Sequence, residues 1–357
     1  MHDTTALIVA GPTASGKSAL ALALAERFGG TVINADSMQV YRELRVLTAR
    51  PSPAEEARVP HTLYGVRPAA EAGNVAWWRA AALAAMDAAR AAGRLPILCG
   101  GTGLYFAALT GGLADIPDPG PVARAEARAL LAEIGPAELH ARLAAVDPVS
   151  ASRLDPADSQ RIARAFEVWR GTGRGLADWQ AGGQSTGQSP GQSPGQPPGQ
   201  PPGQPPRGQS PPGQSGAQTS DGHQPAPGRF AAILLDPPRT DLRAAIADRF
   251  AAMLTAGALE EVRALLALGL DPALPAMRAH GVPELAAHLR GHTTLAEAAR
   301  RAELVTGQYT KRQATWFRHH SLAEFRRVHT IHARYAGPAQ LSERNLCDAI
   351  VFVQHLG

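Results

Sequence analysis

The sequence predicts an α/β fold in which helices flank a parallel sheet and a helical segment is inserted. Short apolar runs alternate with helical stretches along the first third of the chain. The glycine-rich turn "GPTASGKS" joins the first apolar run to the first helical stretch. A later segment, 115–180, is rich in Ala, Arg, Leu and Glu at helical spacing and contains no clear strand. Such alternation is typical of a sheet with helices on both faces and with ligands at the carboxyl ends of its strands.

The elements follow in order along the chain. The predicted strands are short apolar runs at residues 6–10, 31–35, 62–66, 96–99, 230–236 and 328–333. Helical stretches include 18–28 and 75–92, and helices run from the fifth strand to roughly residue 320.

Composition divides the chain into five segments. Residues 1–114 are the first part of the α/β core, 115–180 a helical insertion, and 229–335 the remainder of the core with its C-terminal helices. The segment 181–228 repeats Gly-Gln-Ser/Pro-Pro units with almost no apolar side chains, which cannot offset the entropy of ordering. We therefore expect it to be a disordered linker, and we expect 336–357 to be a tail.

The composition favours a cytoplasmic protein. The start "MHDTTALIVA" lacks the basic residues of a signal peptide, and no opening run is long enough to span a membrane. Two cysteines, Cys99 and Cys347, make neither a disulfide framework nor a zinc site. The net charge of +4 and the pI near 9.4 hint at a polyanionic partner. The 357 residues include two lysines, Lys17 and Lys311.

The stretch "GPTASGKS" fits the phosphate-loop pattern G-x-x-x-x-G-K-[ST], and the strand before it and the helix after it supply the context that the motif needs. Its backbone N–H groups would cradle phosphate oxygens, Lys17 would neutralise charge, and Ser18 would reach a Mg²⁺ ion. The alternative is a structural glycine turn. The predicted diphosphate-binding residues are Gly11, Pro12, Thr13, Ala14, Ser15, Gly16, Lys17 and Ser18.

Asp36 follows the second strand and therefore lies beside the phosphate loop at the carboxyl edge of the sheet. Its carboxylate could hold Mg²⁺ through water, act as a general base, or cap a helix, as Asp and Ser often do. Gln39 offers an amide that suits an adenine edge. After the fourth strand, Cys99-Gly100-Gly101 stands where a Walker ATPase carries an acid, and Thr102 adds a hydroxyl. The missing acid argues against a hydrolytic motor and does not exclude a small-molecule kinase.

Two segments combine basic and aromatic residues. "TGQYTKRQATWFRHH" (306–320) interleaves Lys311, Arg312 and Arg318 with aromatic rings, a pattern that suits phosphate contacts and base stacking. "DSQRIARAFEVWR" (158–170) places Arg161 and Arg164 on one helical face. The alternative for 306–320 is an amphipathic helix with core aromatics and a solvated basic face.

Taken together, these stretches resemble the tRNA dimethylallyltransferase family. The matching segments are "GPTASGKSALALALAERFGG", "NADSMQVYREL", "GRLPILCGGTGLY", "DSQRIARAFEVWRGTGR", "LDPPR", "LPAMRAHG" and "YTKRQATWFR", in the family's order and across nearly the whole chain outside 181–228. The resemblance implies a P-loop NTPase-like fold, with a loop that holds the diphosphate of dimethylallyl diphosphate together with Mg²⁺. It also implies transfer of the dimethylallyl group to N6 of the adenosine at tRNA position 37.

The resemblance also implies roles for single residues. Asp36 would accept the proton of the adenine amine, Lys17, Thr13 and Ser18 with Mg²⁺ would stabilise the departing diphosphate, and Thr102 would lie beside the reacting centre. The target base would be flipped out of its stack to enter. The segment 115–180 would grip the anticodon stem-loop of the tRNA partner; no protein partner is implied, and we expect a monomer. The residues implied to contact tRNA are Asp36, Ser37, Met38, Gln39, Thr102, Arg124, Gln160, Arg161, Ile162, Ala163, Arg164, Arg278, Lys311, Arg312, Gln313, Trp316 and Arg318.

This chain departs from the family pattern at three places. Leu47-Thr48-Ala49-Arg50-Pro51 stands for G-T-A-K-P, and Gly281-Val282-Pro283 stands for G-Y-R. Ala245 occupies a position that usually carries arginine, which leaves Arg239, Arg243 and Arg249 as candidates for a diphosphate contact. A small-molecule kinase remains the alternative function; a non-catalytic RNA-binding protein would not explain Lys17, Asp36 and Thr102.

Overall fold

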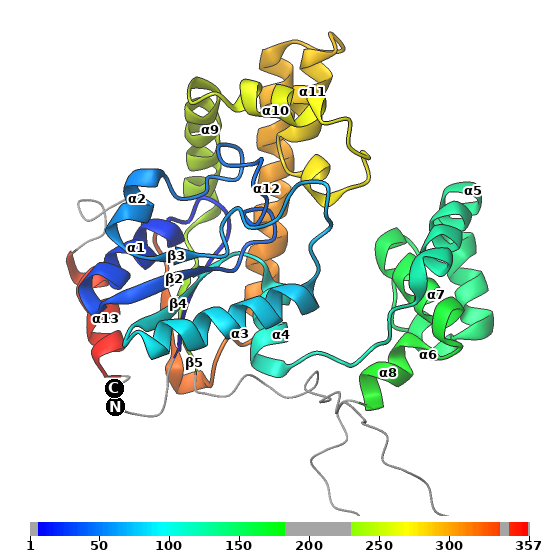
Figure 1. Cartoon of the computed structure of the whole chain (residues 1–357), viewed down its shortest axis with the longest axis horizontal. Helices are drawn as coiled ribbons and strands as arrows, with labels where there is room; N and C mark the ends of the chain where they lie inside the picture. The colour runs from blue at the N-terminus through cyan, green and yellow to red at the C-terminus, as the bar shows by residue number, and fades with distance from the viewer. Residues whose placement is uncertain (1–5, 183–229, 336–342, 356–357) are drawn as a thin grey trace, which may run out of the picture. The chain divides into compact units, whose positions relative to one another are not determined.

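The core of the protein is a six-stranded, wholly parallel sheet with the strand order β3-β2-β4-β1-β5-β6 (Figure 1). The structure is a computed structural model that describes residues 6–182, 230–335 and 343–355. Strands inside a parallel sheet are covered on both faces, which is why "ALIVA" is apolar throughout and why every residue of "ALIVA" and "GTVIN" is buried. The strands are β1 (Ala6–Ala10), β2 (Gly30–Asn34), β3 (His61–Thr62), β4 (Leu95–Gly100), β5 (Phe230–Leu235) and β6 (Val328–Ile331).

Alternate residues of the strands pack into two hydrophobic cores, one on each face of the sheet. Leu7 and Val9 pack against α1 (Lys17–Phe28) and α13 (Glu343–Gln354). Ile8 and Ala10 face the other way, toward α3 (Val75–Ala91), α4 (Gly103–Gly111) and the end of α12 (Leu295–His319). The predicted fold class, a parallel sheet flanked by helices, is confirmed.

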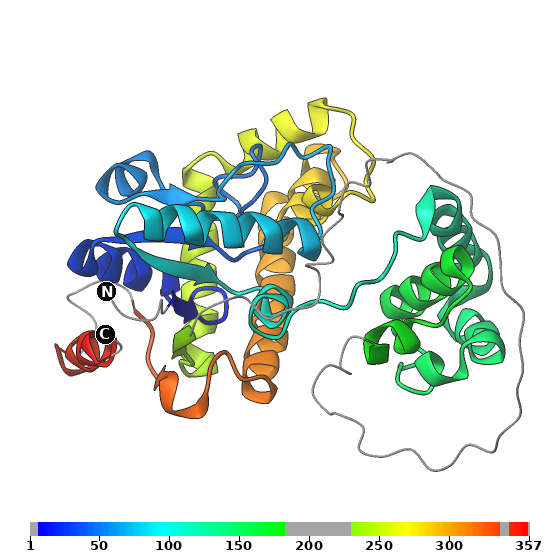
Figure 2. The ribbon, with the colours of Figure 1, turned by 60° about the horizontal axis from the view of Figure 1, so that its bottom comes forward.

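A third core lies among the helices that follow β5. It joins α9 (Arg239–Thr255), α10 (Ala258–Ala267), α11 (Val282–Leu289) and α12 to the segment 38–49. Helices α9 and α12 lie side by side in both views (Figures 1 and 2). The 3₁₀ turn Pro275–Arg278 adds Ala276 to this core, and the short elements elsewhere are α2 (Pro53–Arg58) and the 3₁₀ turn Phe325–Arg327.

The described residues form two compact units, one made of 6–111 with 230–335 and 343–355, and one made of 112–182. The described part of the second unit is helical, with its own core around Ala127, Leu139 and Phe166. Its first helix kinks at Gly135, where φ is 76° and the next residue is Pro136. Its helices are α5 (Gly120–Val146), α6 (Pro148–Ala151), α7 (Ser159–Thr172) and α8 (Leu176–Gly182).

Three elements differ from the sequence-based prediction. The third strand ends at Thr62 rather than at residue 66, because Leu63 adopts a left-handed φ of 64° and turns the chain. The last strand ends at Ile331 rather than at residue 333. The expected tail contains α13, whose Ala349 and Val353 are buried in the core. The predicted linker 181–228 lies outside the described residues apart from its first two. Within the described ranges, no helix is both long and apolar enough to cross a bilayer.

Candidate active site at the carboxyl edge of the sheet

Parallel pairing brings the ends of β1, β2 and β4 to one edge of the sheet. Ala10 lies opposite Gly100, and Asn34 lies opposite Cys99. The N–H of Ala35 donates to Cys99 O at 2.8 Å, and the N–H of Thr102 donates to Ala35 O at 3.2 Å. The phosphate loop, Asp36 and Thr102 therefore meet at this edge, as the order of motifs predicts.

The phosphate loop turns through two left-handed residues, Ala14 with φ of 66° and Gly16 with φ of 91°. Arg334 and Tyr335, which follow β6, hold the backbone of the loop and are called the strap below. The Arg334 guanidinium donates to Ala14 O at 2.9 Å, and the N–H of Tyr335 donates to Ser15 O at 2.9 Å. A Cβ on Gly16 would lie 1.6 Å from Tyr335 O, so no larger residue fits there. The sequence carries no signal for this strap, because its residues lie some 320 positions from the loop.

Two cations beside the phosphate loop, Lys17 and Arg249, interact electrostatically with Asp36. Lys17 is buried, and its ammonium group donates to Pro12 O at 3.5 Å. Burial lowers the pKa of Lys17, while the charge of Asp36 acts in the opposite direction. Burial also lowers the pKa of Arg249, which likewise interacts with Asp36. Arg249 is half-buried and interacts with Asp36, whereas Arg239 and Arg243 are exposed, so Arg249 is the candidate that we carry forward for a diphosphate contact.

Short hydrogen bonds fix the backbone around Asp36. Asn34 is buried, accepts the Asp36 N–H at 2.9 Å, and donates to Asp36 O at 3.0 Å. Asp36 Oδ1 accepts the Met38 N–H at 2.9 Å, and Thr102 Oγ1 accepts the Ser37 N–H at 3.0 Å. One carboxylate oxygen of Asp36 is thus occupied by the loop, and the other has no hydrogen bond among the described residues. Sequence reasoning missed Asn34, although a buried polar residue at a strand end is a recognisable signal.

Helix α12 closes the site with its inner face. Gln313 is buried and contacts both the phosphate loop and the Gly101 turn. Burial raises the pKa of Tyr309, and the neighbouring Thr102 and Gln313 act in the opposite direction. A Cβ on Gly103 would lie 2.2 Å from the Trp316 ring, so the helix approaches the turn closely. Lys311, Arg312 and Arg318 are exposed on the same helix.

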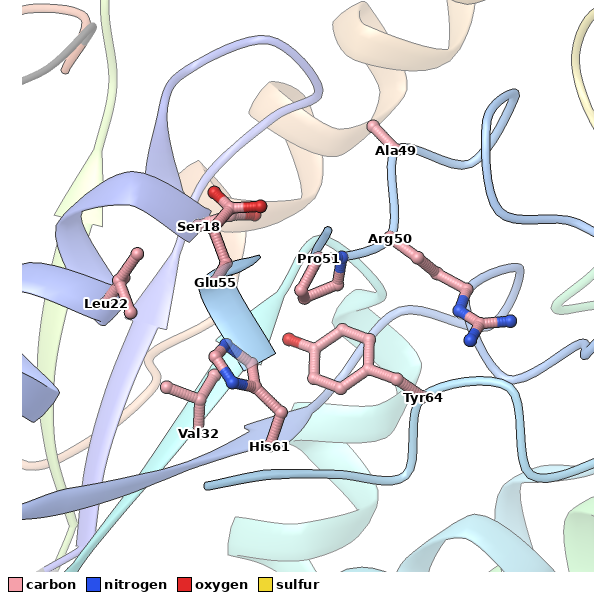
Figure 3. Close-up of a pocket in the computed structure, with 9 residues that line it drawn as sticks. All are labelled: Ser18, Leu22, Val32, Ala49, Arg50, Pro51, Glu55, His61 and Tyr64. Atoms are coloured by element: carbon pink, nitrogen blue, oxygen red, sulfur yellow. The ribbon is translucent and has the colours of Figure 1, made fainter. Parts of the chain in front are cut away.

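Ser18 is exposed at the start of α1 and lines a pocket with Leu22, His61 and Tyr64 (Figure 3). The figure shows Ser18 and Leu22 on one wall and Tyr64 on the other. Within the described ranges, no group of three or more His, Cys, Asp or Glu side chains could hold a metal. Mg²⁺ binds through few protein ligands and completes its octahedron with waters and substrate phosphates, so an exposed hydroxyl beside a phosphate loop fits this ion.

Comparison with known proteins decides the family. A family model described as IPP transferase matches residues 39–194 and 207–320, and one described as isopentenyl transferase matches residues 4–72. The chain belongs to the IPP transferase family. Proteins named tRNA dimethylallyltransferase are similar to it: one from Granulibacter bethesdensis is 57% identical over 355 residues, covering 99% of each chain. Another, from Gluconacetobacter diazotrophicus, is 58% identical over 352 residues, covering 99% of this chain and 95% of the relative.

Solved structures agree with this IPP transferase assignment. The full-length tRNA isopentenylpyrophosphate transferase from Bacillus halodurans is 26% identical, with a TM-score of 0.62 and coverage of 99% of this chain and 96% of that chain. A eukaryotic dimethylallyltransferase that acts on tRNA is 21% identical, with a TM-score of 0.70 over 99% of this chain and 80% of that chain, and shows the likeness of fold.

In this IPP transferase, two predicted tRNA contacts have their side-chain amides engaged inside the protein. Gln39 is buried, and its amide nitrogen donates to Thr48 O at 2.8 Å and to Ala49 O at 3.1 Å. Gln313 has both ends of its amide occupied. The bidentate pairing of Gln39 with an adenine edge is therefore corrected, since both of its N–H groups hold the 48–49 loop.

The other residues implied to contact tRNA differ in how exposed they are. Ile162 is fully buried in the core of that unit and is corrected to a packing residue. Gln160 is exposed, Ala163 is half-buried against the same core, and Arg278, in the other unit, is exposed. The cations in the helical unit form ion pairs with neighbours: Arg124 with Asp118, Arg161 with Asp158, and Arg164 with Glu167.

The departures from the family pattern are accommodated by local structure. Arg50 donates to Tyr41 O and Arg42 O and so holds its own loop. Glu261 of α10 accepts the N–H groups of residues 45–47 at 2.6–2.9 Å. Gly281 caps α11 with φ of 97°, and Pro283 stands in the first turn, where proline is tolerated.

Proposed function

We propose that this protein transfers the dimethylallyl group from dimethylallyl diphosphate to N6 of the adenosine at tRNA position 37 and releases diphosphate. The observation that carries the proposal is the meeting of a cationic phosphate loop with Asp36 and Thr102 at one edge of the sheet. The name that its relatives carry, tRNA dimethylallyltransferase, indicates the same donor and acceptor.

The donor site is arranged for a leaving diphosphate. The N–H groups of the loop, together with Lys17 and Arg249, would hold the diphosphate and stabilise the negative charge that grows on it as the C1–O bond breaks. Arg249 would supply the positive charge that the family usually has at position 245, where this chain has alanine. Ser18 would ligate Mg²⁺, which would neutralise further charge on the diphosphate.

The acceptor side supplies a base. An exocyclic adenine amine is a poor nucleophile, so its attack on C1 needs removal of the N6 proton. The unoccupied oxygen of Asp36 would accept that proton. The Asp36 N–H donates to Asn34 Oδ1 and so fixes the backbone, and the Met38 N–H donates to Asp36 Oδ1 and so keeps the carboxylate in place. Ser37 and Thr102 would border the flipped base.

tRNA would be gripped by exposed arginines and by Lys311, through contacts with phosphates of the anticodon stem-loop. We infer a monomeric enzyme that works in the cytoplasm, where tRNA is available. The direct test supplies bulk tRNA with either labelled dimethylallyl diphosphate or γ-labelled ATP. Label from the prenyl donor should appear in tRNA and label from ATP should not. Transfer of phosphate from ATP instead would favour the alternative, a kinase.

A further inference from the structure

We propose that Gln313 is a positioning residue that sets the spacing between the donor site and the acceptor site. This inference rests on the proposed prenyl transfer and adds a residue whose role is to align the two substrates. One side-chain amide bridges the two segments that would hold them.

The contacts of Gln313 connect three parts of the chain. Its Oε1 accepts the N–H of Thr13 in the phosphate loop at 2.8 Å, and its Nε2 donates to Gly101 O at 2.9 Å. The side chain is 5% exposed, so these bonds are shielded from water. Thr13 lies 300 residues away in sequence, and Gly101 lies 212 away.

Each partner of Gln313 continues directly into one substrate site. Thr13 belongs to the loop that would bind the diphosphate, so the position of Thr13 affects where C1 of the donor lies. Gly101 precedes Thr102, whose hydroxyl accepts the Ser37 N–H next to Asp36. The position of Gly101 therefore affects where N6 of the adenine and the base Asp36 lie. The amide therefore spans the donor loop and the turn on which the acceptor site is built.

Helix α12 is a firm support for such a bridge. Phe317, one turn after Gln313, is buried in the core beneath the sheet, and Trp316 packs against Gly103. A Cβ on Gly101 would lie 2.2 Å from Gln313 Nε2 and 3.2 Å from Gly11 O, so turn, amide and loop are in close contact. Because transfer needs the reacting atoms aligned at about 3–3.5 Å, a shift of about 1 Å between the two segments can cost about 100-fold in rate.

Gln313→Leu removes both bonds while keeping the volume nearly constant. We expect single-turnover transfer at saturating substrates to fall about 10- to 100-fold. The separate dissociation constants of tRNA and of an unreactive thiodiphosphate analogue of the donor should change less than about threefold, since each site keeps its own contacts. Thr310→Val is the matched control: Thr310 is buried on the same helix, and its hydroxyl has no hydrogen-bond partner within the described residues. This control should transfer at the wild-type rate.

Gln313→Glu tests the bridge by its hydrogen-bonding pattern. A protonated carboxyl can accept from Thr13 and donate to Gly101 O as the amide does, whereas the ionised form faces that carbonyl without a donor. The ratio of the variant's rate to the wild-type rate should therefore rise as the pH is lowered. A pure packing role predicts a ratio that does not depend on pH.

Gly101→Ala gives a second route to the same displacement. Its Cβ would push the Gln313 amide aside, so its rate loss should not add to that of Gln313→Leu in the double variant. The proposal is overturned if Gln313→Leu transfers within about twofold of wild type, if its loss resides wholly in donor affinity, or if the pH ratio is flat. Failure of the wild type to prenylate tRNA would refute the proposed function instead.

Discussion

Replacing Asp36 by asparagine separates basicity from structure at the reacting centre. Asp36 Oδ1 accepts the Met38 N–H at 2.9 Å, and the amide oxygen of Asn can keep that bond. The Asp36 N–H stays fixed by Asn34. The substitution therefore removes the charge and the proton-accepting power while leaving the turn intact.

The expected loss is that of a general base. Such a group contributes about 10²–10⁴ to the rate, which corresponds to about 2.7–5.4 kcal/mol of activation free energy. The negative charge of Asp36 also raises the pKa of Lys17 against its burial, and it lies near the incoming diphosphate. Removal of that charge should leave donor affinity unchanged or slightly improved, so the loss should appear in kcat.

Single-turnover transfer, tRNA binding and thermal stability are the three measurements for Asp36→Asn and Asp36→Ala. Alanine loses the bond to Met38 as well as the base. If the role is chemical, both variants lose rate equally and bind tRNA normally. Near-wild-type turnover of the Asn variant, with a loss only in the Ala variant, would show that Asp36 merely fixes the turn.

Three further outcomes are expected. Because burial lowers the pKa of Lys17, the affinity for dimethylallyl diphosphate should begin to fall at a pH below the ordinary lysine range. Lys17→Arg should lack this decline at alkaline pH. The same dependence of KM on pH in the wild type and in Lys17→Arg would contradict the assignment. Arg334→Ala, which frees Ala14 O, should raise the donor KM about tenfold and leave tRNA affinity unchanged, as titration of each ligand would show. Lys311→Ala and Arg318→Ala should each flatten the dependence of log K for tRNA on log salt by about 0.7–0.9; unchanged slopes would make this face solvated surface.

The sequence could predict the parts of the site that follow strands. A parallel sheet brings the carboxyl ends of its strands to one edge, so Lys17, Asp36 and Thr102 were expected together from the order of motifs alone. The sequence could have identified Ile162 as a core residue, because Ala165 and Phe166 follow it at helical spacing. All three are buried in the structure.

The other errors have a different cause. The engagement of Gln39 with the 48–49 loop depends on the course of an irregular segment, for which the sequence has no periodic signal. The choice among Arg239, Arg243 and Arg249 stayed open for a similar reason, because it depends on which face of α9 is covered. Helix α13 was missed because its apolar residues lie at the end of a polar segment that reads as a tail.

The contacts that shape the phosphate loop come largely from the far end of the chain. Gln313 holds Thr13, Arg334 and Tyr335 hold Ala14 and Ser15, and Arg249 adds charge opposite Asp36. Strand β5, from the same C-terminal part, pairs with β1 along its whole length and so protects the strand that feeds the loop. The motif at residues 11–18 is therefore enough to recognise a phosphate loop in the sequence. The donor site also needs residues from the C-terminal part. Since the C-terminal part also carries the exposed cations of α12, the same residues that would meet tRNA belong to the element that finishes the donor site, and the two substrates' sites are built on one continuous support.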